Sequence, residues 1–115
     1  MTARFGFPPS LRLRKRAEFL RLSHEGIKVH QAHFILIYRK NHDNSFRFGV
    51  TVSRKVGNAV TRNRVKRLVR EFCRHALPVP QADYSIIARK GAGTLGANAV
   101  RVELEKAFRQ VPKAP

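Results

Sequence analysis

Positively charged side chains gather between positions 54 and 74, in the segment RKVGNAVTRNRVKRLVREFCR. Eight of these residues are Lys or Arg, and the only acid among them is Glu71. Guanidinium and ammonium groups donate strong, charge-assisted hydrogen bonds to phosphate oxygens. The chemistry that this segment predicts is therefore the binding of a polyanion.

The same segment has the spacing of an amphipathic helix. Counted from Val65, apolar residues follow at i+3, i+4, i+7 and i+11, which is one face of an α-helix. They are Leu68, Val69, Phe72 and Ala76. At about 100° per residue, a polar set falls together on another face. It comprises Asn63, Lys66, Arg67, Arg70 and Arg74, with Arg62 at the boundary near the helix start. One face is thus predicted to pack on a core, while the other presents cations.

Acidic and histidine residues show no arrangement typical of a catalytic site. The 7 Asp and Glu residues include no pair that suggests the two-metal site of a nuclease. His30 and His33 are the one close histidine pair, without a Cys or carboxylate at the spacing of zinc ligands. Residues 90–94 lack the complete phosphate-loop pattern. We therefore expect no catalytic residue and no metal site on this chain, and interpret it as a binding protein.

Composition indicates what it binds. The 24 Lys and Arg residues give 115 residues a formal net charge of +17. Clustered positive charge is typical of proteins that bind nucleic acid or anionic membranes. A spanning helix needs about 20 apolar residues, and no segment approaches that length. A hydrophobic fraction of 43% with eight Phe residues argues against a disordered basic tail. We expect a nucleic-acid partner and no membrane.

Length and cysteine content indicate one domain in a reducing compartment. A chain of 115 residues is large enough for a single core and too small for two. Cys73 is the only cysteine, so no internal disulfide can form, and its place beside the apolar stripe predicts a core or boundary residue. The first ten residues have no apolar run typical of a secretory signal, so we expect a cytoplasmic protein.

The elements that must position the basic helix begin with an N-terminal arm over residues 1–10, whose consecutive prolines favour extended backbone. A helix is predicted over 12–23, capped by Ser10. Its expected core stripe is Leu13, Ala17, Leu20 and His24, with Phe19 and Leu22 to the side. Residues 33–40 and 46–53 have the composition and alternation of strands, and the turn residues between them favour a hairpin. Residues 27–31 add a possible short strand.

Further along the chain, Asn58 or Thr61 is the expected N-cap of the basic helix, which should end near Leu77 before two prolines. Residues 83–89 predict another strand, and residues 95–111 a final amphipathic helix. The order α-β-β-α-β-α predicts an α+β fold, a small sheet of three to four strands packed with helices. We assign residues 11–111 to this single domain and residues 112–115 to a short tail.

The kind of nucleic acid follows from what surrounds the basic helix. A recognition helix for the DNA major groove usually follows a tight helix-turn-helix, whereas strands flank this one. Aromatic rings beside cations suit single-stranded RNA, because splayed bases stack on rings while cations hold phosphates. Phe48 is expected in the core, and Phe19 is the better stacking candidate. Without further information, a ribosomal or RNA-chaperone role remains an alternative.

The segment from Arg54 to Arg67, RKVGNAVTRNRVKR, closely resembles the signature of the bacterial ribonuclease P protein component. The central Arg62-Asn63-Arg64 is weak alone, but the preceding Gly-Asn-Ala-Val, the basic helix and the flanking strands TVSRK and YSIIARK make it specific. The resemblance runs from about residue 11 to residue 108.

This resemblance implies a small α+β fold in which the basic helix follows its strand by a left-handed crossover, opposite to the general rule. It also implies a cytoplasmic ribonucleoprotein, an endonuclease (a hydrolase) of tRNA processing that removes the 5′ leader of precursor tRNA. The catalytic Mg²⁺ site would lie on the RNA subunit, so the chain itself would bind no cofactor. The protein would be a monomer in a 1:1 complex with ribonuclease P RNA.

The resemblance assigns roles to particular residues as well. Contacts with the catalytic RNA would come from Arg62, Asn63, Arg64, Lys66, Arg67 and Arg70, and Arg74 continues this basic face. A cleft between that helix and the sheet would hold the leader, with Arg54 and Lys55 near it and Phe19 stacking on a base. Many family members have a second aromatic residue one turn later, where this chain has Ser23. The stacking contribution would then be weaker, or would be supplied elsewhere, for example by Phe34 or Tyr38.

Overall fold

The computed structural model of the chain describes residue 13 and residues 15–41, 46–75 and 80–112. Its regular elements are α1 (Arg16–Glu25), β1 (Ile27–His30), β2 (Phe34–Arg39), β3 (Phe46–Val52), α2 (Ala59–His75), β4 (Ala82–Ala88) and α3 (Ala97–Arg109). Two short 3-10 helices, η3 (Arg54–Val56) and η4 (Ala92–Thr94), follow β3 and β4. The predicted order and α+β class are confirmed, with the short strand over 27–31 present as β1. The arm 1–10 with Ser10, residues 76–77 and the end of the tail lie outside the described residues.

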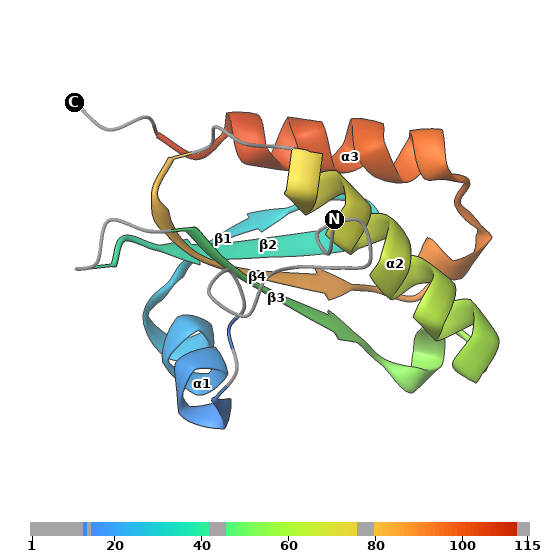
Figure 1. Cartoon of the computed structure of the whole chain (residues 1–115), viewed down its shortest axis with the longest axis horizontal. Helices are drawn as coiled ribbons and strands as arrows, with labels where there is room; N and C mark the ends of the chain where they lie inside the picture. Colours follow the sequence, from blue (N-terminus) through green and yellow to red (C-terminus); the bar gives the residue numbers. More distant parts are fainter. Residues whose placement is uncertain (1–12, 14, 42–45, 76–79, 113–115) are drawn as a thin grey trace, which may run out of the picture.

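The strands form one mixed sheet in the order β1-β2-β4-β3 (Figure 1). β2 is antiparallel to β1 and to β4, whereas β3 and β4 are parallel and are joined through α2. The predicted hairpin between 33–40 and 46–53 is therefore wrong, because β4 lies between these two strands. Five of the seven residues of β4 are buried, so this apolar strand is most stable with a neighbour on each edge. The β3–α2–β4 unit is where the family resemblance places the left-handed crossover.

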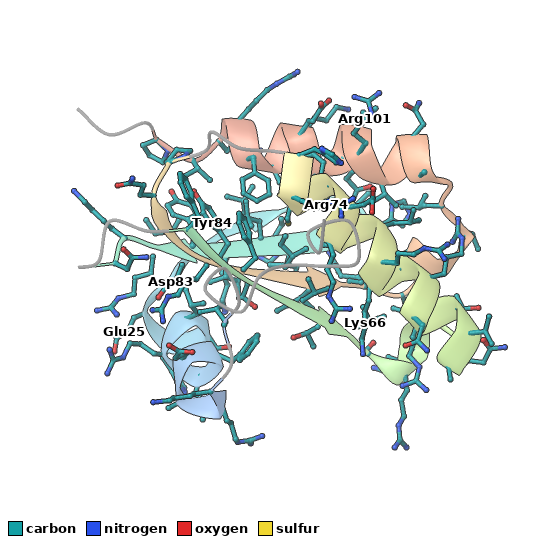
Figure 2. All side chains as sticks on the ribbon, in the orientation of Figure 1. Glu25, Lys66, Arg74, Asp83, Tyr84 and Arg101 are labelled. Atoms are coloured by element: carbon teal, nitrogen blue, oxygen red, sulfur yellow. The ribbon has the colours of Figure 1, made fainter. Side chains whose placement is uncertain are left out.

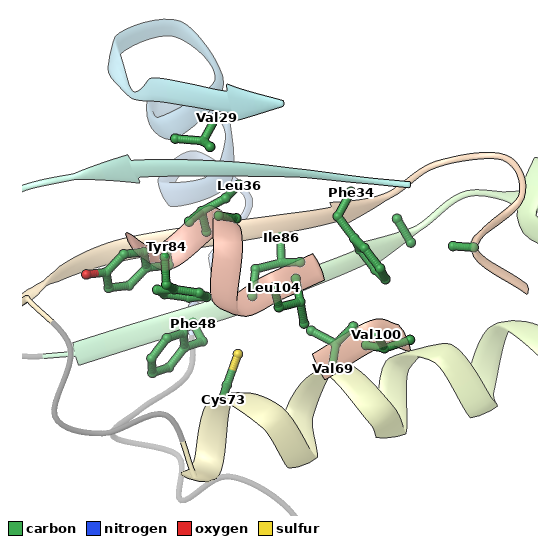
Figure 3. Close-up of a cluster of buried hydrophobic side chains, with 14 of the residues drawn as sticks. Val29, Phe34, Leu36, Phe48, Val69, Cys73, Tyr84, Ile86, Val100 and Leu104 are labelled. Atoms are coloured by element: carbon green, nitrogen blue, oxygen red, sulfur yellow. The ribbon is translucent and has the colours of Figure 1, made fainter. Parts of the chain in front are cut away.

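The larger core lies between one face of the sheet and the helices α2 and α3 (Figure 3). The rings of Phe48 and Tyr84 stack there with centroids 5.3 Å apart, and Phe108 of α3 lies 5.0 Å from Tyr84. Phe48 is thus a core residue, as predicted. Cys73 is also fully buried, and burial raises the pKa of its thiol, so it packs as a small apolar residue and remains unreactive.

The opposite face of the sheet carries α1 and a much smaller core (Figure 1). Leu13, Leu22 and Ile37 are its buried residues, with Phe19 partly buried against them. The predicted stripe of α1 is wrong at Ala17, Leu20 and His24, which are exposed. The helix begins at Arg16, four residues later than expected, so Leu13 precedes it and the face that meets the sheet carries Phe19 and Leu22. Helical periodicity alone did not reveal this shift in the starting residue.

Candidate nucleic-acid interface

The basic helix α2 starts at a defined cap. The side chain of Asn58 accepts a hydrogen bond from the backbone N–H of Thr61 at 2.9 Å, so Asn58 is the N-cap of the two predicted candidates. Gly57, just before it, has φ of 155°, a conformation that L side chains rarely adopt. This turn directs the chain out of β3 and η3 into α2. The Gly-Asn pair of the signature therefore determines where the basic helix begins.

The two predicted faces of α2 are confirmed. Val65, Val69 and Cys73 are fully buried, and Leu68 and Phe72 pack partly buried against the same core. On the other side, Asn63, Arg67 and Arg70 are exposed. Lys66 and Arg74, which Figure 2 labels, are partly exposed. Arg74 is paired with Glu71 at 2.8 Å. The helix thus carries an outer basic face, defined here as Asn63, Lys66, Arg67, Arg70 and Arg74.

Arg62 and Arg64 lie apart from that face. Arg62 is partly buried at the edge of the core, and its Nε has no hydrogen-bond partner within the described part of the chain. Arg64 turns to the other edge of α2, where its guanidinium donates to the backbone carbonyls of Leu95 at 2.6 Å and Gly93 at 3.4 Å. The second arginine of the signature therefore joins α2 to the segment after β4. An RNA contact by Arg64 stays a prediction.

A second basic cluster forms at one end of the sheet. Arg54 and Lys55 follow β3 after one residue, Arg89 and Lys90 directly follow β4, and all four are exposed. They come to the same end of the sheet because β3 and β4 are parallel, with Val52 opposite Ala88. Arg89 and Lys90 were missed by sequence reasoning. The basic pair was visible after the third predicted strand, but the expected hairpin paired the wrong strands.

Beyond α1, the sheet face that α1 covers carries a row of side chains across all four strands. The strand registers align His30, Ile35, Ile87 and Thr51 in this row. Ile35 and Ile87 are partly buried, whereas His30 and Thr51 are exposed. Phe19 lies one step from this row, with its ring on the backbone of Gly49: a Cβ at Gly49 would be 2.3 Å from Cε1 of Phe19. Phe19 and the row therefore share one side of the sheet, and the row lies next to the strand ends that the basic residues follow.

The expected cleft between α2 and the sheet is wrong, since buried residues of the larger core fill that space. The two expected substitutes for the second aromatic ring do not reach the α1 side either. Phe34 is fully buried, and Tyr38 packs partly buried against the larger core. Because side chains alternate along a strand, both point to the α2 and α3 side of β2. Phe19 is the aromatic candidate that the structure leaves partly exposed on the α1 side.

Metal-binding groups are scattered. Within the residues that the structure describes, no three His, Cys, Asp or Glu side chains gather closely enough to hold a metal ion. In the same part of the chain, no helix has the length and apolar character needed to cross a membrane. Two of the acids instead hold other elements: Glu25 forms an ion pair with Arg39, and Glu103 forms hydrogen bonds with the ring and the backbone N–H of His33.

The family model described as Ribonuclease P matches residues 7–112. The chain belongs to this family. It is 46% identical over 110 residues to the "Ribonuclease P protein component" of Geotalea uraniireducens, covering 95% of this chain and 97% of that protein.

Solved structures of the family agree. The RNase P protein of Staphylococcus aureus is 34% identical with a TM-score of 0.80, covering 86% of this chain and 93% of that one. The RNase P protein of Thermotoga maritima is 33% identical with a TM-score of 0.79, covering 88% and 97%. The resemblance inferred from the signature is thereby confirmed. A member of this family is an RNA-binding subunit of ribonuclease P, the endoribonuclease of tRNA 5′-end maturation, which replaces the ribosomal or chaperone alternative.

Proposed function

We propose that the chain binds ribonuclease P RNA through the outer basic face of α2 and the 5′ leader of precursor tRNA through the α1 side of the sheet. The observation that carries this proposal is the separation of two basic surfaces. One is the outer basic face of α2. The other is the cluster of Arg54, Lys55, Arg89 and Lys90 beside the open row of the sheet.

The first surface suits a folded RNA. The cations of α2 project from a rigid helix, and Arg62 lies at its edge, so they can hold phosphates at fixed spacing without reading bases. The second surface suits a single strand. Exposed cations at the sheet end can hold phosphates, while the ring of Phe19 and the partly buried Ile35 and Ile87 offer apolar contact to unstacked bases.

This arrangement divides the work between protein and RNA. The RNA subunit would supply the Mg²⁺-dependent cleavage. The protein, a monomer in a 1:1 complex, would lower the repulsion between two polyanions and add leader contacts that mature tRNA lacks. We further propose that this takes place in the cytoplasm, where the free thiol of Cys73 stays reduced.

The test is cleavage of a precursor tRNA at low Mg²⁺ by a bacterial ribonuclease P RNA, with and without this protein. We expect leader removal when both are present and none from the protein alone. The protein should also tighten binding of precursor tRNA more than that of mature tRNA. Equal tightening of both would contradict the leader contact, and absence of stimulation would contradict the proposed role of the protein with that RNA.

A further inference from the structure

Helix α1 is attached to the sheet by few apolar contacts. Of its ten residues, Leu22 is the only one that is fully buried, and Phe19 is partly buried beside it. The position of α1, and with it that of the Phe19 ring, must therefore depend on polar contacts as well. A few such contacts place the first turn of the helix.

The guanidinium of Arg47 on β3 lies at the centre of these contacts. Its Nε and Nη2 donate to the two carboxylate oxygens of Asp83 on β4, each at 2.9 Å, and its Nη1 donates to Glu18 of α1 at 2.6 Å. Asn41 also donates to Asp83, at 2.9 Å. The side chains are largely shielded, with Arg47 25% and Asp83 17% exposed. The pKa of Arg47 is raised, mainly by its hydrogen bonds to Asp83, and the guanidinium therefore stays charged.

A planar guanidinium with three donors engaged has little freedom to move. Asp83 accepts from Nε and Nη2 and so fixes the plane of the guanidinium group. The direction in which Nη1 donates to Glu18 is then fixed as well. Glu18 is fixed from its other oxygen too, which accepts the backbone N–H of Lys15 at 3.2 Å. The first turn of α1 is thereby oriented against the end of the sheet where β3 and β4 begin.

A second contact between α1 and β3 lies beside this ion pair. Phe19 follows Glu18 on α1, and Gly49 lies two residues after Arg47, on the same face of β3. The Phe19 ring occupies the space that a side chain at Gly49 would fill, with Cε1 and Cζ 2.3 and 2.5 Å from an added Cβ. The ion pair and the ring contact are thus neighbouring attachments between the same two elements.

We propose that Arg47, held by Asp83 and bound to Glu18, is a positioning residue that sets the Phe19 ring for stacking on a base of the 5′ leader. This inference rests on the proposed leader contact of Phe19. It predicts that loss of the ion pair lowers the preference of the holoenzyme for tRNA with a leader. The affinity of the protein for ribonuclease P RNA should not change.

The test compares holoenzymes assembled from ribonuclease P RNA and variant proteins, and measures the ratio of affinities for a precursor tRNA and the same tRNA without its leader. Glu18→Gln keeps a side chain that can cap the helix but removes the charge that pairs with Arg47. Arg47→Lys keeps the net charge but removes the planar guanidinium, whose donors bind Asp83 and Glu18 together. Stacking of one base is worth about a fivefold to a hundredfold in affinity, so we expect each variant to lower the ratio by about threefold to tenfold.

Two further variants make the result specific. Glu25→Gln changes the net charge as Glu18→Gln does, but its partner is Arg39 at the other end of α1, at 2.9 Å. We expect it to leave the ratio unchanged. In a Phe19→Ala background, Glu18→Gln should have no additional effect, because the ring through which it acts is gone. Thermal unfolding of each protein checks that the fold persists.

The possible outcomes separate the two proposals. If Phe19→Ala lowers the ratio while Glu18→Gln and Arg47→Lys do not, the positioning role is overturned and the leader contact stands. If Phe19→Ala has no effect, the stacking role falls, and this inference with it. An equal loss in Glu25→Gln, or additive losses in the double variant, would mean that Glu18 acts independently of the ring and would also overturn the inference.

Discussion

Arg64 belongs to the basic signature, yet its guanidinium is bound to the carbonyls of Gly93 and Leu95. Hydrogen bonds from a charged donor contribute about 1.5–3 kcal/mol, so we expect Arg64→Gln to lower the free energy of unfolding by about 1–3 kcal/mol. Arg67→Gln, at an exposed position, should change it by less than about 0.5 kcal/mol. Urea unfolding of both variants measures this difference. An Arg64→Gln protein as stable as the Arg67→Gln protein would show that the contact contributes nothing to the fold.

At the scale of an element, α2 acts as a row of charges on a rigid support. If its five outer or edge cations, Arg62, Lys66, Arg67, Arg70 and Arg74, each neutralise one phosphate, log K should fall with log salt at a slope of about −3.5 to −4.5. Arg67→Gln with Arg70→Gln should reduce that slope by about 1.5–2. The matched control is Lys106→Gln with Arg109→Gln, which removes two charges in the last turn of α3. Titration of ribonuclease P RNA at several salt concentrations measures the slopes, and equal changes in both pairs would reject α2 as the contact.

The whole molecule keeps its two proposed RNA surfaces apart, because α2 and α1 cover opposite faces of one sheet (Figure 1). The effects of variants should separate accordingly. Phe19→Ala should weaken the preference for a leader about fivefold or more without changing affinity for ribonuclease P RNA. Arg67→Gln with Arg70→Gln should weaken affinity for ribonuclease P RNA. It should not change the preference for a leader once the holoenzyme is assembled at saturating protein. Binding assays with the RNA subunit and with both tRNA forms measure this, and a variant that alters both affinities equally would indicate a single continuous surface.

Short-range sequence patterns were sufficient to predict features that depend on one element alone. The faces of α2 follow from 3.6 residues per turn, and capping preferences limited its start to two residues, Asn58 or Thr61, of which the structure selects Asn58. Local pattern was insufficient where two elements compete for one neighbour. The turn residues between 33–40 and 46–53 favour a hairpin, but β4 pairs with both strands and separates them. The same limit applies to α1, whose buried side depends on where the sheet meets it.

The sequence by itself determined the basic helix, the α+β class and, through the signature around Arg62-Asn63-Arg64, the family. These properties depend on residue type and short spacings, which a linear chain already contains. The tertiary structure alone decided that Arg89 and Lys90 join Arg54 and Lys55, that Arg64 binds backbone carbonyls, and that Arg47 connects Asp83 to the helix bearing Phe19. All of these residues come from segments about 30 residues or more apart, which only the packing of the sheet and its helices brings together. For Arg47 and Arg64 that packing places the partners within hydrogen-bonding distance.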